Sequence, residues 1–159
     1  MTTENNNHLR ELIRILVRNL GILEKNDASC CSVTVGQCHA IVEIGRVGSI
    51  SLTELSDLVG VDKSTMSRTI NNLVEDDMVI RDIDDDNRRY VNIQLTDSGR
   101  MIFNNIEKTM NTYYQGIFDT IPEDKRDQVL ESLQVLKDAV KNHQQGSWVQ
   151  MVFETPPEP

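Results

Sequence analysis

The sequence predicts a mainly α-helical protein of the α+β class, with long helices on either side of a compact central segment. Leucine and isoleucine recur at steps of three and four residues near both ends of the chain, which is typical of amphipathic helices. Between residues 78 and 95 the periodicity changes to that of two short β-strands. With 159 residues, 38% of them hydrophobic, the chain is long enough to bury a core without disulfides or structural metals.

Two helices are expected before the central segment. The first is predicted over residues 8–23, and the polar residues 25–32 are predicted to form a turn. A second helix is expected to begin near Thr34. Its apolar side is formed by Cys38, Ile41, Val42, Ile44 and Val47.

The central segment has the pattern of two short helices joined by a glycine turn. Ser51 is a capping residue for the first of them, and Gly60 can end it because glycine tolerates the left-handed conformation. The second is expected from Lys63 to Val74. The predicted buried residues of the pair are Leu52, Leu55, Leu58, Val59, Met66, Ile70, Leu73 and Val74.

A two-stranded ribbon and two more helices complete the predicted order. Strands are expected at 78–81 and 89–95, joined by a polar hairpin tip over 82–88. Thr96 begins the cap of a long helix whose apolar residues extend to Ile121. Pro122 ends this helix and starts the next, which extends to about residue 143. The tail, residues 144–159, has no helical period and is expected to be mobile.

Helix, glycine turn, helix and ribbon in this order form a winged helix-turn-helix. The turn makes the second helix project so that it can enter a DNA major groove, and the ribbon reaches toward an adjacent groove. The outer face of that helix offers short donors and acceptors, and two arginines lie at the ribbon tip. The candidate DNA-contacting residues are Lys63, Ser64, Thr65, Ser67, Arg68, Asn71, Asn72, Arg88 and Arg89.

Three segments resemble the MarR family of bacterial and archaeal transcriptional regulators. They are the helix-turn-helix residues 52–55 with 61–68, the wing 84–89 and the Ile-Gln-Leu-Thr-Asp-Ser-Gly-Arg stretch at 93–100. The resemblance covers about residues 8–143. Asn87 stands where the family usually has an acidic residue before the arginines.

The resemblance implies a homodimer that binds a palindromic operator in double-stranded DNA. Residues 1–159 would form one MarR-type domain, with dimerisation helices at 8–48 and 97–143 and a DNA-binding lobe at 51–96. The residue pattern agrees, because long apolar stripes at both ends exceed what one small domain can cover. Members of the family are typically repressors released by a phenolic ligand, a metal or an oxidant.

Charge is the main objection to DNA binding. The net charge of the chain is −9. Residues 62–100 contain six basic and nine acidic residues, a net of −3, but 63–74 contain two basic and no acidic residues. The alternative is a winged-helix module that binds protein and not DNA. No enzyme motif is present, neither a phosphate loop nor a nucleophile elbow nor a dinucleotide fingerprint, so no catalytic residue and no required cofactor is predicted.

The three cysteines are the candidate effector site. Cys30, Cys31 and Cys38 lie within nine residues of one another, next to His39. Thiolates with an imidazole suit a soft metal ion or arsenite, and neighbouring thiols suit reversible oxidation. The alternative is that all three only pack as small hydrophobic side chains. No apolar signal core and no membrane-spanning run is present, so a cytoplasmic protein without membrane contact is expected.

Overall fold

The computed structural model describes residues 2–30, 32–83, 86 and 91–145, with the backbone alone for residues 2, 21–30 and 145. It is mainly helical with a small antiparallel sheet, as predicted. The chain divides into two compact units, Met1–Asn111 and Thr112–Pro159. No helix within the described ranges is long and apolar enough to cross a membrane.

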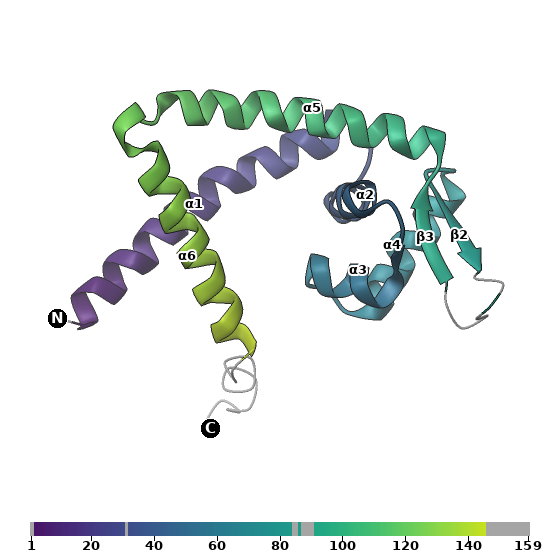
Figure 1. The fold of residues 1–159 in the computed structure, drawn as a ribbon, viewed down its shortest axis with the longest axis horizontal. Coiled ribbons are helices and arrows are strands. Elements are labelled where there is room, and N and C mark those ends of the chain that lie inside the picture. The colour runs from purple at the N-terminus through teal and green to yellow at the C-terminus, as the bar shows by residue number, and fades with distance from the viewer. Residues whose placement is uncertain (1, 31, 84–85, 87–90, 146–159) are drawn as a thin grey trace, which may run out of the picture. The chain divides into compact units, whose positions relative to one another are not determined.

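The first unit holds most of the elements (Figure 1). They are α1 (Thr2–Cys30), α2 (Val35–Val47), β1 (Ile50–Ser51), α3 (Leu52–Val59), α4 (Lys63–Glu75), β2 (Val79–Ile83), β3 (Val91–Leu95) and the first part of α5 (Asp97–Thr120). The order matches the prediction, with one added strand, β1.

The first helix is longer than predicted. It begins at Thr2 and continues to Cys30, so the turn expected at 25–32 is wrong over residues 25–30. Those residues include neither glycine nor proline, and therefore nothing in the backbone stops the helix. The chain turns only at Ser32, whose φ is +56°.

Side-chain caps begin the helices where the sequence indicates. Thr34 and Gln37 form a reciprocal capping box at α2, with bonds of 2.9 and 3.2 Å. Ser51 and Glu54 form another at α3. At α5, the Gly99 N–H donates to the Thr96 hydroxyl over 3.0 Å. These bonds satisfy helix N–H groups that have no partner within the helix.

One hydrophobic core joins α2, α3, α4 and the sheet. It contains Val33, Ala40, Ile41, Ile44, Ile50, Leu55, Met66, Ile70, Leu73, Val79, Ile93 and Ile106. Two residues of the predicted buried faces are wrong, since Leu58 and Val74 are 56% and 38% exposed. Val47, expected on the apolar side of its helix, is 55% exposed. Each lies in the last turn of its helix, where the chain leaves the core.

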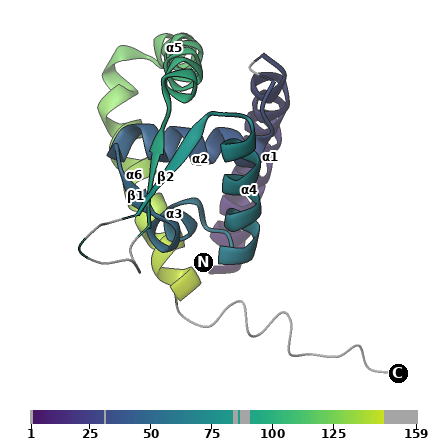
Figure 2. The ribbon, with the colours of Figure 1, turned by 90° about the vertical axis from the view of Figure 1, so that its right-hand side faces the viewer.

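The sheet is antiparallel with strand order β1-β3-β2. β3 is central, and its Ile93 pairs with Ile50 on one side and Arg81 on the other. α2 and α3 lie against β3, and α4 lies against β2 (Figure 2). The expected hairpin tip is wrong at residues 82 and 83, which continue β2. The rest of the tip, apart from residue 86, lies outside the described residues.

The second unit contains the end of α5, a 3₁₀ turn η1 (Glu123–Lys125) and α6 (Arg126–Gln145). Pro122 separates the two helices as predicted, and the Arg126 guanidinium donates to the Ile121 carbonyl over 3.2 Å. Within the described residues of this unit no side chain is buried. The predicted tail begins inside α6 and otherwise, over 146–159, lies outside the described residues.

Candidate nucleic-acid interface

The glycine turn fixes α3 against α4. Gly60 adopts φ +76° and ψ +34°, a left-handed conformation that costs other residues energy. Its N–H donates to the Ser56 carbonyl over 2.9 Å. Leu55 of α3 and Ile70 of α4 are fully buried in the same core. One face of α4 is therefore held by packing, and the opposite face is left to solvent.

The exposed face of α4 contains the predicted contact residues. Lys63, Ser64, Thr65, Arg68, Asn71 and Asn72 are all exposed. Ser67 is half-buried and so lies at the edge of this face. Residues 64, 68 and 71 are separated by one helical turn each, which aligns them along the helix. Arg88 and Arg89, predicted at the ribbon tip, lie outside the described residues.

Asp62 is a residue of this face that the predicted set lacks. It is the N-cap of α4. Its Oδ1 accepts from the Thr65 N–H over 2.8 Å and from the Ser64 hydroxyl over 2.9 Å. Its Oδ2 accepts from the Thr65 hydroxyl over 2.7 Å. An aspartate directly before a helical pattern is a capping signal, so the sequence contained the evidence for this position.

The hydrogen bonds of Asp62 determine its charge state. The Thr65 hydroxyl contributes most, followed by the Thr65 N–H and the Ser64 hydroxyl, and together they hold the pKa of Asp62 well below its ordinary value. The carboxylate is therefore ionised at neutral pH. A fixed negative charge lies at the start of α4, where a phosphate would otherwise find a favourable helix end.

Arg81 is the second residue that the predicted set lacks. It lies on β2, and its guanidinium donates a short hydrogen bond to Oδ1 of Asn71 on α4. Both side chains are exposed. Sequence periodicity cannot find a pair like this, because it depends on how a strand and a helix pack together. The bond links the ribbon to the candidate DNA-contacting face.

Four acidic residues lie at the two ends of α4. Asp62 is at its first turn, and Glu75, Asp76 and Asp77 are exposed at its last turn. The two ends of a 13-residue helix are about 20 Å apart. Arg68 therefore lies in the middle of the exposed face, between the two acidic ends of α4.

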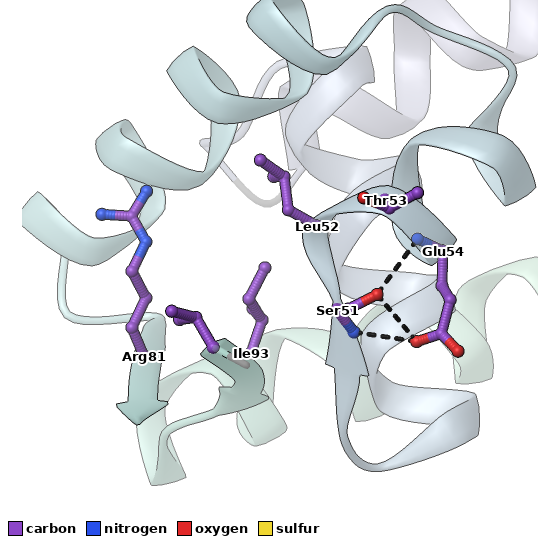
Figure 3. A pocket seen from close by; sticks show the side chains of 7 residues that line it. Ser51, Leu52, Thr53, Glu54, Arg81 and Ile93 are labelled. Carbon is purple, nitrogen blue, oxygen red and sulfur yellow. Dashed lines mark hydrogen bonds between the residues drawn. The ribbon is translucent and has the colours of Figure 1, made fainter. Parts of the chain in front are cut away.

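A pocket of about 530 Å³ lies between the start of α3 and the sheet (Figure 3). Its lining combines polar and apolar side chains: Ser51, Leu52, Thr53, Glu54, Arg81, Val91 and Ile93. The Ser51–Glu54 capping bonds form one wall, and Arg81 stands on the opposite side (Figure 3). Arg81 thus belongs both to the pocket and to the contact with α4.

The candidate effector residues are only partly described. Cys38 is half-buried beside the core, whereas His39 is exposed on α2. Cys30 is the last residue of α1, but its side chain and all of Cys31 lie outside the described residues. In the described part of the chain, no group of three or more His, Cys, Asp or Glu side chains is placed to hold a metal ion. Sensing and packing therefore both stay predictions.

A protein-family model matches the central part of the amino-acid sequence. Residues 33–91, from Val33 of the core to the first residue of β3, match the model described as the MarR family. No curated protein matches the chain.

Solved structures with the same fold extend over most of the chain. A MarR transcriptional regulator from Methanosarcina mazei Go1 aligns at 24% identity, covering 85% of this chain and 98% of that one, with a TM-score of 0.71. Streptococcus pneumoniae FabT in complex with DNA aligns at 21% identity, 86% and 98% coverage and a TM-score of 0.78. A MarR family protein from Bacillus stearothermophilus aligns at 18% identity, 89% and 99% coverage and the same TM-score. Over most of its length the chain therefore has the same fold as these three proteins.

Proposed function

We propose that the chain is a homodimeric transcriptional regulator that binds a palindromic DNA operator sequence-specifically through α4 and the ribbon. The observation behind this proposal is the exposed face of α4. Arg68, Asn71 and Asn72 project from a helix whose other face, with Met66 and Ile70, is buried in the core of a MarR-family domain. Such a helix can enter a major groove without disturbing the packing that holds it.

Exposed apolar side chains support dimerisation. On α1, Leu9, Leu12, Leu16 and Val17 are 45–62% exposed. On α6, Leu130, Leu133, Val135 and Val140 are 44–65% exposed. Stripes of this kind at both ends of a chain are typical of surfaces covered by a second copy. A two-fold dimer would present two α4 helices about one turn of DNA apart, which suits a palindrome.

We propose repression released by an effector as the mode of regulation, in the cytoplasm. Thiol oxidation or metal binding at Cys30, Cys31, Cys38 and His39 is the candidate signal. Cys38 packs beside Ile41 and the other core residues, so a chemical change at its thiol would alter the packing of α2. The same position fits the alternative in which Cys38 only fills space.

A protein-binding module without DNA activity is the competing function. The net charge of −9 favours it, because an acidic surface repels phosphates. The middle of the α4 face, where Arg68 has no acidic neighbour within Lys63–Val74, favours DNA.

Two arginine variants test the DNA contacts. Arg68→Ala should lower affinity for the operator at least tenfold with little change for a scrambled duplex, because base contacts provide the discrimination. Arg88→Ala should weaken both duplexes evenly and lower the salt slope by about one unit, as loss of one phosphate contact does. The control is Lys125→Ala, an exposed cation outside α4.

Fluorescence anisotropy with both duplexes at several salt concentrations is the measurement. If Arg68→Ala and Arg88→Ala both bind as the unmodified protein does, this face is not the DNA-binding surface.

A further inference from the structure

The hydroxyls of Ser64 and Thr65, at the start of α4, can act only as donors toward Asp62. A hydroxyl normally both donates and accepts, so Ser64 and Thr65 would tolerate many partners. Here both hydroxyls bond to Asp62, at 2.9 and 2.7 Å. An ionised carboxylate has no hydrogen to give, so each hydroxyl must direct its own hydrogen toward Asp62. Toward a ligand, Ser64 and Thr65 then present only lone pairs.

The hydrogen bond of the Asn71 amide also fixes its orientation, but this side chain presents a donor and not an acceptor. Its partner is the guanidinium of Arg81, a group with donors and no acceptor. The Asn71 oxygen must therefore face Arg81, and the amide NH₂ is directed elsewhere. Toward a ligand, Asn71 presents a donor.

These two orientations come from different elements, one from the cap of α4 and one from β2. We propose that α4 contacts DNA with a fixed hydrogen-bond polarity: Ser64 and Thr65 accept from the amino groups of adenine or cytosine, and Asn71 donates to an acceptor on the DNA. This inference rests on the proposed function and adds the chemical class of base groups that the helix recognises.

The chemistry of the groove supports this assignment. Phosphate oxygens only accept, and guanine and thymine present only acceptor atoms in the major groove. Neither can bond to an acceptor-only hydroxyl, and the Asp62 charge repels the phosphates as well. Adenine N6 and cytosine N4 carry the donors that Ser64 and Thr65 require. Asp62 is thus a specificity-determining residue that acts through its two neighbours.

Base analogues test the acceptor end. A duplex is first selected from a randomised pool with the full chain, and the base pairs under the start of α4 are located by their altered selection with Thr65→Ala. Adenine is then replaced by 2-aminopurine, which lacks the major-groove amino group, and cytosine by pyrimidin-2-one. The unmodified protein should lose about tenfold in affinity at one of these pairs, the cost of one base contact. Replacing guanine there by 7-deazaguanine should change affinity less than about twofold.

Asp62→Asn is the decisive variant. Asparagine still caps the helix through Oδ1, but its NH₂ takes the place of Oδ2 and cannot accept. The Thr65 hydroxyl is therefore released to donate. The tenfold dependence on the amino group should fall below about threefold. Asp57→Asn, with the same charge change on exposed α3, should keep the tenfold dependence. Equal dependence in Asp62→Asn and unmodified protein, or no dependence in the unmodified protein, overturns the inference. Selection of no duplex at all overturns the proposed function, and the inference with it.

A double-variant cycle tests the donor end. If Arg81 acts by orienting Asn71, then Asn71→Ala, Arg81→Gln and the double variant should each lose about fivefold in affinity, because the two residues work as a unit. The salt slope should stay unchanged in Arg81→Gln. Additive losses near 25-fold, with a slope lower by about one, would show that Arg81 binds a phosphate itself and would overturn its positioning role.

Discussion

The lobe of α2, α3, α4 and the sheet differs from the second unit in how it uses its apolar residues. In this lobe, Ile41, Ile44, Leu55, Ile70 and Leu73 are fully buried within one chain. In the second unit, Leu133 and Val135 of α6 are 48% and 65% exposed, and no described side chain is buried. The lobe therefore buries its own core, whereas the apolar side chains of α6 stay exposed to solvent in the single chain.

Because of this difference, mutations in the lobe and mutations on α6 should change different properties, the stability of the chain and its association. A change in the lobe should alter the stability of each chain, because its core contacts are internal. A change on α6 should alter association, because its apolar side chains meet water in the single chain. The three predictions below follow this division, from the largest expected effect to the smallest.

A charge on the α6 stripe should have the largest effect. Leu133→Glu would bury a carboxylate in the proposed dimer interface, so the dimer dissociation constant should rise at least about 100-fold while the chain stays folded. Asn142→Glu adds the same charge elsewhere on α6 and should leave association unchanged. Sedimentation equilibrium and circular dichroism measure the two properties. An unchanged dimer in Leu133→Glu would mean that this stripe is not the interface.

A cavity in the lobe should have the next largest effect. Leu73→Ala removes a fully buried side chain and should lower the free energy of unfolding by about 2–5 kcal/mol. Leu58→Ala, at a side chain 56% exposed, should change it by less than about 0.5 kcal/mol. Urea unfolding compares them. Equal effects at the two positions would contradict the burial that defines the lobe.

Two glycines of α5 should respond to alanine with opposite signs. A Cβ at Gly99 would lie 1.9 Å from the Met78 carbonyl oxygen, so the backbone must shift, and Gly99→Ala should destabilise by about 1–3 kcal/mol. At Gly116 a Cβ has no neighbour within 4 Å, so Gly116→Ala should stabilise by about 0.5–1 kcal/mol through helix propensity. Thermal unfolding of both variants is the measurement, and a shared sign would refute the contrast.

The sequence predicted what depends on local pattern. The Ser51 cap and the Gly60 turn are signals of single residues, and the buried faces of α2 and α4 repeat with the helical period. Leu58 and Val74 were wrong because periodicity does not show where a helix leaves the core. β1 has only two residues, too few to show the alternation of polar and apolar residues that marks a strand.

Within the candidate site, the exposed face of α4 was predictable, but its hydrogen-bond network was not. The place of Asp62 directly before Lys63 marks a cap, but the sequence does not show that its carboxylate also binds the hydroxyls of Ser64 and Thr65. The contact between Arg81 and Asn71 depends on how β2 and α4 pack, and no spacing in the sequence encodes that packing.

The mass of the complex with DNA tests the central claim most directly. The unmodified chain is mixed at low salt with a short duplex from the upstream region of its own gene. The molar mass of the complex is then measured by light scattering after size-exclusion chromatography. A dimeric DNA-binding regulator should give a complex of two chains on one duplex. Raised salt and Arg68→Ala should each lower the affinity of this complex. A folded dimer that leaves the duplex unbound at low salt would contradict it and favour the protein-binding module.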